Sequence, residues 1–267
     1  MSANGTNTSD SAGATGIGTE GGRFYKKQQL SPSRVVAFSH RSRFGMARRL
    51  VTPHAGKRLL DYGCGDGTFI SESADLFPDA VGADISSVQI DDCVRRLGNV
   101  ASLRFVHTSE LAAPEFSGQF DIATCMETLE HCPEPELREA LGALLRLVSP
   151  GGTIVISVPI EIGPTLLAKH AIRRALGWRG VGDYRYTEAY TGRELLKMTF
   201  ANAETEIERP LYESNEHPHK GFNWRALERR LRSLMDVRHV HFSPFPWSAG
   251  WVSSQVWFVC QTPLSAR

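Results

Sequence analysis

The stretch that most constrains the fold is a glycine-rich turn, Leu59-Leu60-Asp61-Tyr62-Gly63-Cys64-Gly65-Asp66-Gly67-Thr68-Phe69-Ile70. Apolar residues on both sides of the turn predict a buried strand, a tight turn and a helix. Glycines at alternate positions let the backbone adopt conformations that a Cβ forbids, and let it approach a ligand closely. Unpaired N–H groups at the start of the helix are expected to face that ligand. The turn therefore predicts a nucleotide-type binding loop.

Composition fits an ordinary globular protein of 267 residues, with 41% hydrophobic and 22% charged residues. The net charge of +1 provides no general field for nucleic acid or an acidic membrane. Five scattered cysteines predict reduced thiols and a cytoplasmic enzyme. Residues 1–22 contain neither Lys nor Arg, so they resemble neither a secretory signal nor a transit peptide.

Strand and helix patterns alternate from Lys57 onward. The expected strands are Arg58–Tyr62, Ala80–Ala83, Leu103–His107, Phe120–Cys125 and Thr153–Val158. The expected helices are Gly67–Leu76, Ser87–Leu97 (capped by Ser86 or Ser87) and Glu134–Val148. This alternation predicts a parallel sheet with right-handed crossovers. Two later strands, Val237–Phe242 and Gln255–Gln261, would complete a Rossmann-like, mostly parallel α/β sheet of seven strands, with helices on both faces.

We expect four segments along the chain. They are a disordered tail (1–22), an N-terminal helical cap (23–56), a cofactor-binding core (57–160), and a substrate cap or insert with the closing strands (161–267). In the cap, Ser31-Pro32 is expected to open a helix that reaches Val51 in two pieces, broken near Gly45. Its arginines are interpreted either as a solvated face or as part of a cap over the ligand site, with one guanidinium reaching a carboxylate.

The insert contains a basic amphipathic pattern over Pro164–Trp178. Residues 165–178 could make weak contact with a membrane surface, although a packed lid or insertion is the favoured interpretation. Thr191-Gly192-Arg193-Glu194 predicts a capping box that opens a helix ending near Phe200. A further helix is expected at Trp224–Leu234.

Acidic residues at the strand ends indicate which nucleotide-type ligand binds. Asp84 ends the second strand, where its carboxylate can accept both hydroxyls of a ribose; its alternative role is that of an anion at a helix N-terminus. Thr68 occupies the sixth position of the glycine pattern, so the dinucleotide fingerprint fails. Asp61 suits an ammonium group better than a pyrophosphate. A ribose and an amine without a phosphate point to S-adenosylmethionine.

The core from about Lys57 to Pro159 resembles class I S-adenosylmethionine-dependent methyltransferases. The segments that carry the resemblance are 60–67, Gly82-Ala83-Asp84, Phe120–His131 and Leu147–Gly152. The resemblance implies a set of cofactor-binding residues: Asp61, Gly63, Cys64, Gly65, Gly67, Asp84, Ile85, Thr108 and Cys125. Thr108 stands where the family often has an acidic residue for the adenine amino group, and its hydroxyl can accept a hydrogen bond in that place.

Glu127, Glu130 and His131 have i, i+3, i+4 spacing, which predicts that they project to one side of a helical turn. This segment resembles that of ubiquinone-pathway O-methyltransferases. We expect His131 to be the base or the residue that orients the acceptor, with Glu130 or Glu127 setting its tautomer. The alternative is that Glu130 and His131 only brace the loop.

Several functions remain open from the sequence. The expected one is O-methylation of a small-molecule, quinone, secondary-metabolite or glycan-type acceptor, with no metal. The same segment also resembles the metal site of RNA 3′-terminal 2′-O-methyltransferases, with His170, His217 or His219 as a further ligand. An NAD-type oxidoreductase and a non-catalytic cofactor-binding protein are alternatives from other classes. The sequence indicates neither the acceptor nor the oligomeric state.

Overall fold

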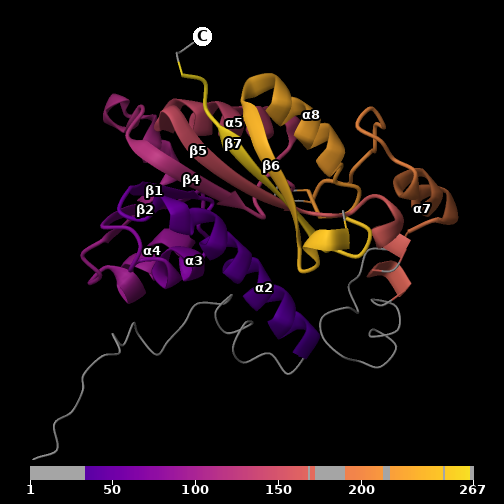
Figure 1. The fold of residues 1–267 in the computed structure, drawn as a ribbon, viewed down its shortest axis with the longest axis horizontal. Helices are drawn as coiled ribbons and strands as arrows, with labels where there is room; N and C mark the ends of the chain where they lie inside the picture. The colour runs from indigo at the N-terminus through magenta and orange to yellow at the C-terminus, as the bar shows by residue number, and fades with distance from the viewer. Residues whose placement is uncertain (1–33, 168, 172–189, 213–216, 249, 265–267) are drawn as a thin grey trace, which may run out of the picture.

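A computed structural model describes residues 34–167, 169–171, 190–212, 217–248 and 250–264. Its strands are β1 (Arg58–Tyr62), β2 (Asp79–Asp84), β3 (Leu103–His107), β4 (Phe120–Met126), β5 (Val148–Pro159), β6 (Asp236–Ser243) and β7 (Gln255–Gln261). They form one sheet in the order β3-β2-β1-β4-β5-β7-β6, in which only β7 is antiparallel to its neighbours (Figure 1). The predicted seven-stranded, mostly parallel sheet is confirmed.

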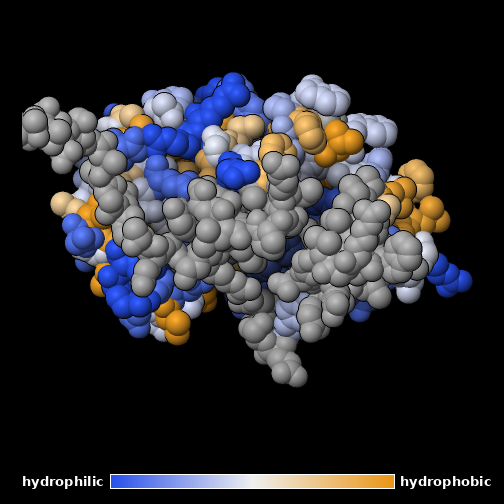
Figure 2. Space-filling view, turned by 90° about the horizontal axis from the view of Figure 1, so that it is seen from below, coloured by the Kyte–Doolittle hydropathy of each residue, from blue (hydrophilic) through white to orange (hydrophobic). Residues whose placement is uncertain are grey.

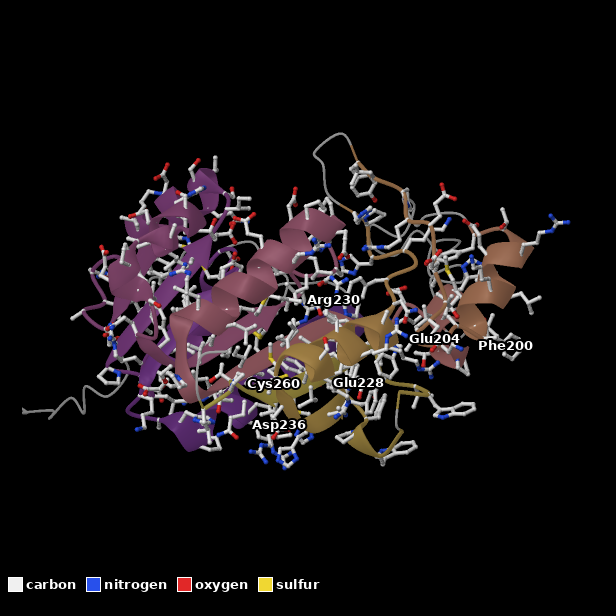
Figure 3. The ribbon with its side chains drawn as sticks, turned by 90° about the horizontal axis from the view of Figure 1, so that it is seen from above. Phe200, Glu204, Glu228, Arg230, Asp236 and Cys260 are labelled. Carbon is white, nitrogen blue, oxygen red and sulfur yellow. The ribbon has the colours of Figure 1, made fainter. Side chains whose placement is uncertain are left out.

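Helices cover both faces of this sheet, as predicted. The described helices are α2 (Arg34–Val51), α3 (Thr68–Glu72), α4 (Ser87–Leu97), α5 (Glu134–Leu147), α7 (Gly192–Thr199) and α8 (Trp224–Leu234). Short 3-10 turns lie at Thr52–His54, Thr108–Ala112, Pro114–Phe116 and Pro246–Ser248. In Figure 1, α2, α3 and α4 lie below the sheet and α5 and α8 above it. Figure 3 shows α5 and α8 side by side, where Arg230 of α8 pairs with Glu134 of α5 at 2.6 Å.

The core consists of two apolar layers, because successive residues of a strand point to opposite faces. Leu59 belongs to the layer between the sheet and helices α2, α3 and α4. Leu60 belongs to the layer between the sheet and helices α5 and α8. Both side chains are fully buried, and burial of such a side chain contributes about 1.5–3 kcal/mol. The two layers fix the sheet and thereby the loops at its carboxyl edge.

Two helices differ from their predictions. α2 runs unbroken through Gly45. Its buried face, which includes Phe44, Ala47 and Val51, packs on the sheet, and this burial stabilises the helix by more than the glycine destabilises it. α3 ends at Glu72 rather than near Leu76. Beyond Glu72 the chain continues to Leu76 in tighter turns, in which N–H groups bond to carbonyls three residues earlier. Arg48 of α2 donates to the carbonyl of Glu72 at 2.5 Å.

Other boundaries are close to the sequence expectations. α4, β3, α8 and β7 have the predicted bounds. β5 begins at Val148, before Pro150-Gly151-Gly152, because Val148 already pairs with Phe120 of β4. The capping box of α7 is present, with the Thr191 and Glu194 side chains each accepting a backbone N–H of the other residue.

The described residues of the segment 161–171 are partly packed against the core and partly exposed. Residues 164–167 and 169–171 are helical, and the Leu166 side chain is fully buried. The Lys169 ammonium donates to the Ile160 carbonyl at 2.8 Å and to the buried Glu161 carboxylate at 3.0 Å. The remainder of the predicted amphipathic stretch, residues 172–178, lies outside the described residues.

Among the described helices, none combines the length and the apolarity that a membrane crossing requires. Figure 2 shows the molecule from below, where the coloured hydrophobic residues form small separate groups among hydrophilic ones.

The start of α4 provides a test of the local structure. Ser86, not Ser87, is the N-cap, and its side chain accepts the Gln89 N–H. We expect Ser86→Ala to lower the free energy of unfolding by about 0.5–2 kcal/mol, measured by urea denaturation. The neighbouring exposed Ser87→Ala should change it by less than about 0.5 kcal/mol. Equal effects would contradict the assignment of the cap.

Candidate functional site

The backbone N–H groups of the glycine-rich turn form hydrogen bonds within the turn and with β2. The N–H groups of Gly63 and Cys64 donate to the Ala83 carbonyl at 2.7 and 3.0 Å, and the Gly65 N–H donates to Asp84 Oδ2 at 2.9 Å. Asp66 Oδ1 accepts the N–H of Thr68 at the start of α3. The expectation of unpaired N–H groups facing the ligand is therefore wrong for these positions. Because their donors are already satisfied, the turn is poorly suited to a pyrophosphate.

Glycine is required in this turn for conformational and steric reasons. Gly63, Gly65 and Gly67 have φ values of +78°, +54° and +70°, in the left-handed region. A Cβ on Gly63 would also lie 2.3 Å from Thr128 Oγ1. The turn therefore lies against the segment that follows β4.

The ribose and adenine candidates lie together at the ends of β2 and β3. Asp84 pairs in register with His107, and Thr108 follows directly at the start of its 3-10 turn. Asp84 Oδ1 accepts the Ser86 N–H at 2.9 Å, so each carboxylate oxygen has one backbone donor and retains acceptor capacity. Ile85 is 74% exposed, although it is a large apolar side chain. It can serve as a flat apolar support for a base.

Asp61 is almost completely buried at the end of β1. Its Oδ1 accepts the Thr124 hydroxyl at 2.7 Å, and its Oδ2 is buried without a hydrogen-bond partner among the described residues. Burial raises the pKa of this carboxyl to about 7, against the opposing effect of the Thr124 hydrogen bond. An unsatisfied buried acceptor of this kind fits a ligand ammonium group.

β4 continues one residue beyond the predicted end and then turns sharply. The Cys125 side chain is fully buried in the core, so only its backbone lies at the edge of the site. Glu127 has a φ of +52°, and it is the one described non-glycine residue with a positive φ. Its carboxylate meets the Arg43 guanidinium of α2 at 3.2 Å, with both side chains mostly buried. One arginine of the N-terminal helix thus reaches a carboxylate, that of Glu127, whereas the cap over the ligand site stays a prediction.

Glu127, Glu130 and His131 do not lie on a helix. The chain between β4 and α5 forms a turn, in which the His131 N–H donates to the Thr128 carbonyl at 3.0 Å. Pro133 delays the first helical turn of α5 to Glu134. Glu130 is nevertheless close to each of the other two, because its Oε1 lies 3.9 Å from His131 Nε2 and its carboxyl interacts electrostatically with Glu127.

Glu130 has an unusual environment. Its side chain is fully buried, and neither carboxylate oxygen has a hydrogen-bond partner in the described part of the chain. Burial, together with the charge of Glu127, raises the pKa of Glu130 well above its usual range. Such a carboxyl is expected to be protonated or to be neutralised by a cation.

His131 is held by a distant segment. Its Nδ1 lies 2.8 Å from the His217 carbonyl, and the His217 N–H donates to the His131 carbonyl at 2.8 Å. Because a carbonyl oxygen can only accept, Nδ1 carries the proton of the neutral ring and Nε2 keeps its lone pair. The expectation that a glutamate sets the tautomer is wrong, since Glu130 Oε1 lies 3.9 Å from Nε2, beyond hydrogen-bonding distance.

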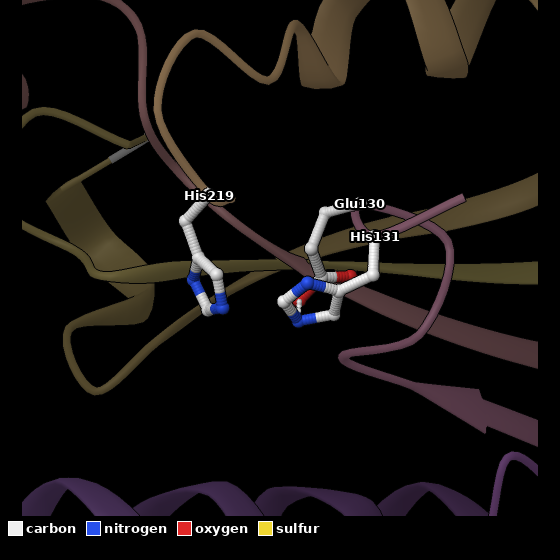
Figure 4. A group of neighbouring side chains, drawn as sticks. All are labelled: Glu130, His131 and His219. Atoms are coloured by element: carbon white, nitrogen blue, oxygen red, sulfur yellow. Dashed lines mark ion pairs between the residues drawn. The ribbon is translucent and has the colours of Figure 1, made fainter. Parts of the chain in front are cut away.

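His219 completes the cluster. One donor atom each from Glu130, His131 and His219 lie within 4.8 Å of one another, and the two imidazole rings meet edge to face at 4.7 Å between centroids. Figure 4 shows His219 on one chain segment facing Glu130 and His131 on another. The arrangement can move a proton, or it can hold a divalent cation.

Of the three histidines considered as a further ligand, the structure brings His219 to this position. His170 packs edge to face on Tyr190, and His217 Nδ1 binds the Pro210 carbonyl at 2.7 Å. Sequence reasoning considered the arginines of the N-terminal helix together, without choosing Arg43, and gave Arg209 no role. Arg209 donates to the carbonyls of Glu130 and Pro218. No local pattern reveals the contact with Glu130, since the two residues lie 79 positions apart.

Residues 39–202, more than half of the chain, match the sequence model of a methyltransferase domain. The chain is 31% identical over 157 residues to a ubiquinone biosynthesis O-methyltransferase of Idiomarina loihiensis, covering 57% of this chain and 63% of that protein. It is 36% identical over 109 residues to the protein of that name from Methylococcus capsulatus, covering 40% and 45%. The matches span less than two thirds of these relatives' length.

Solved structures share the fold. The methyltransferase domain of bacterial CtHen1 aligns with a TM-score of 0.53 and 18% identity over 84% of this chain and 99% of that chain. The PH0226 protein of Pyrococcus horikoshii gives a TM-score of 0.58 and 15% identity over 90% and 96%. The [4+2]-cyclase SpnF gives a TM-score of 0.51 and 16% identity over 84% and 81%. At these identities the likeness concerns the architecture.

The buried carboxyl of Asp61 generates a pH-dependent prediction. Because its folded pKa is raised, the folded protein without ligand retains a proton that the unfolded chain releases at about pH 4. Asp61 therefore lowers the free energy of unfolding as pH rises from about 4 to 7, by up to about 4 kcal/mol. The stability of Asp61→Asn relative to wild type should increase across this window and level off above it, measured by urea denaturation. A difference that is constant with pH would contradict the assignment.

Proposed function

Because this chain belongs to the family of methyltransferase domains, which it matches over residues 39–202, we propose that it transfers a methyl group from S-adenosylmethionine to a hydroxyl of a small-molecule acceptor. Quinone-type, secondary-metabolite and glycan-type acceptors are the classes we consider. The observation that carries the proposal is the position of Asp61, Asp84 and the Glu130–His131 pair at the carboxyl ends of the parallel strands β1, β2 and β4.

The donor is proposed to lie across the ends of β1 and β2. Asp84 would accept the ribose hydroxyls, Ile85 would support the adenine and Asp61 would face the amine. Arg43 has a buried Nε without an acceptor among the described residues, which suits the carboxylate of the same ligand. The satisfied N–H groups of the turn favour this phosphate-free ligand over NAD. The sulfonium of the bound donor supplies an electrophilic methyl group, so the protein has to align and deprotonate the acceptor.

His131 is the proposed base. The His217 carbonyl holds its Nδ1 proton, which directs the Nε2 lone pair towards the side of Glu130 and His219. An acceptor hydroxyl placed there would lose its proton to Nε2 as its oxygen attacks the methyl group. Glu130 would stabilise the imidazolium that forms. A cofactor-binding protein without turnover is the alternative from another class, and the [4+2]-cyclase among the structural neighbours shows that this fold also serves other reactions.

A second candidate is favoured by the Glu130–His131–His219 cluster. A carboxylate whose two oxygens lack a hydrogen-bond partner among the described residues, together with two imidazoles, is a suitable donor set for Mn²⁺, Fe²⁺, Co²⁺ or Zn²⁺. A cation would remove the cost of the buried charge. The enzyme would then be metal-dependent, in the manner of RNA 3′-terminal 2′-O-methyltransferases or with a small acceptor. The expectation of a metal-free site is open to the test described below.

The donor assignment is tested with S-adenosylhomocysteine as the probe. Asp84→Ala should weaken its binding by about 1–3 kcal/mol in calorimetry, because charged hydrogen bonds are lost. Asp79→Ala, at the opposite end of β2, is the matched control and should leave the affinity unchanged. NAD should not bind. Unchanged affinity in Asp84→Ala, or protection from heat unfolding by NAD alone, would overturn the assignment.

A cation titration separates the two candidates. If the cluster holds a metal, EDTA-treated protein should bind Co²⁺ with one site, observed by calorimetry and by the visible spectrum of the ion. Glu130→Gln and His219→Ala should each abolish this site, whereas His239→Ala on β6 should not. Absence of binding, together with methyl transfer that survives EDTA, would leave His131 acting as a base without a metal.

A further inference from the structure

Arg209 lies at the junction of the two segments that form the cluster. It precedes the segment 217–220, which carries His219, and its half-buried side chain reaches back to the turn that carries Glu130 and His131. Its guanidinium packs over the Phe222 ring at 5.1 Å. This stacking holds the plane of the guanidinium in a fixed orientation.

The guanidinium donates to three backbone carbonyls. Arg209 Nη2 donates to the Pro218 carbonyl at 2.5 Å and to the Glu130 carbonyl, and Nε donates to the Lys220 carbonyl at 3.4 Å. Pro218 and Lys220 flank His219, while Glu130 precedes His131. The Arg209 guanidinium therefore connects the backbone on both sides of His219 to the backbone next to His131.

The link has a consequence for the chemistry of His131. Its Nδ1 proton is held by the carbonyl of His217, which belongs to the same segment. If this segment moved away from the turn, His131 would lose the acceptor that fixes its tautomer. His219 would leave the cluster at the same time.

We infer that Arg209 is a positioning residue for the reaction: by joining segment 217–220 to the turn after β4, it fixes the Nδ1–H tautomer of His131 and the approach of His219. It does not touch the donor or the acceptor. This inference rests on the proposed function only for its kinetic consequence, because the tautomer is a property of the protein without substrate.

Three variants test it. Arg209→Met keeps the aliphatic stem and removes every donor. Arg209→Lys keeps the charge but replaces the planar fork by a single nitrogen, which cannot span the three carbonyls. The matched control is Arg225→Met, since Arg225 also donates to a backbone carbonyl, that of Ala201 at 2.6 Å, and lies over an aromatic ring, that of Trp224.

The readout is long-range ¹H–¹⁵N NMR of histidine-labelled protein at pH 8.5, which distinguishes the two imidazole tautomers. Wild type and Arg225→Met should show His131 protonated at Nδ1. Both Arg209 variants should show a mixture of tautomers while they bind S-adenosylhomocysteine with an affinity within about 2-fold of wild type. With an acceptor in hand, kcat should fall about 10–100-fold while the KM for S-adenosylmethionine changes little.

Arg209→Lys keeps the test decisive if Arg209→Met does not fold. A wild-type tautomer of His131 in either folded Arg209 variant would overturn the inference. An altered tautomer in Arg225→Met would show that the signal reports general loosening, and would also overturn it. If wild type transfers no methyl group to any acceptor while the tautomer responds as expected, the proposed function fails and the positioning role stands.

Discussion

The carboxyl group of Glu130 is completely removed from water and has no hydrogen-bond partner among the described residues. An isolated buried charge of this kind costs several kcal/mol, so the fold has to surround it with compensating groups or keep it protonated. The end of β4, helix α2 and the segment before α8 all contribute to its surroundings. His131 and His219 lie beside this carboxyl, and Arg43 of α2 interacts with it electrostatically.

The sheet provides the geometry in which this arrangement can be stable. β1, β2 and β4 end at the same edge, and the register pairs Asp61 with Thr124 and Asp84 with His107. These pairings are set by the apolar layers on both faces, which are remote from the polar side chains. The polar groups at the edge are thus held by packing that does not depend on them, and a strained residue such as Glu127 can be tolerated.

Sequence reasoning succeeded where the determining interactions are local. The bounds of α4, β3, α8 and β7 follow from apolar periodicity and capping residues within each segment. It failed where a distant partner decides. Arg48 of α2 binds the last carbonyl of the shortened α3, and the His217 carbonyl rather than a nearby glutamate sets the His131 tautomer. The paired N–H groups of the glycine turn also depend on β2, which the turn itself does not reveal.

The antiparallel strand β7 has a consequence for how the chain is made. Thr153–Pro159 of β5 pair with Gln255–Gln261, which are synthesised long after β5 has left the ribosome. Until then β5, whose buried residues are mostly aliphatic, has one open backbone edge, and such edges recruit other strands. The sheet is therefore completed only when β7 pairs with β5, and a contact between residues so far apart in the sequence slows folding. We expect the yield of folded protein in cells to depend on how well the open edge of β5 is protected from other strands during synthesis.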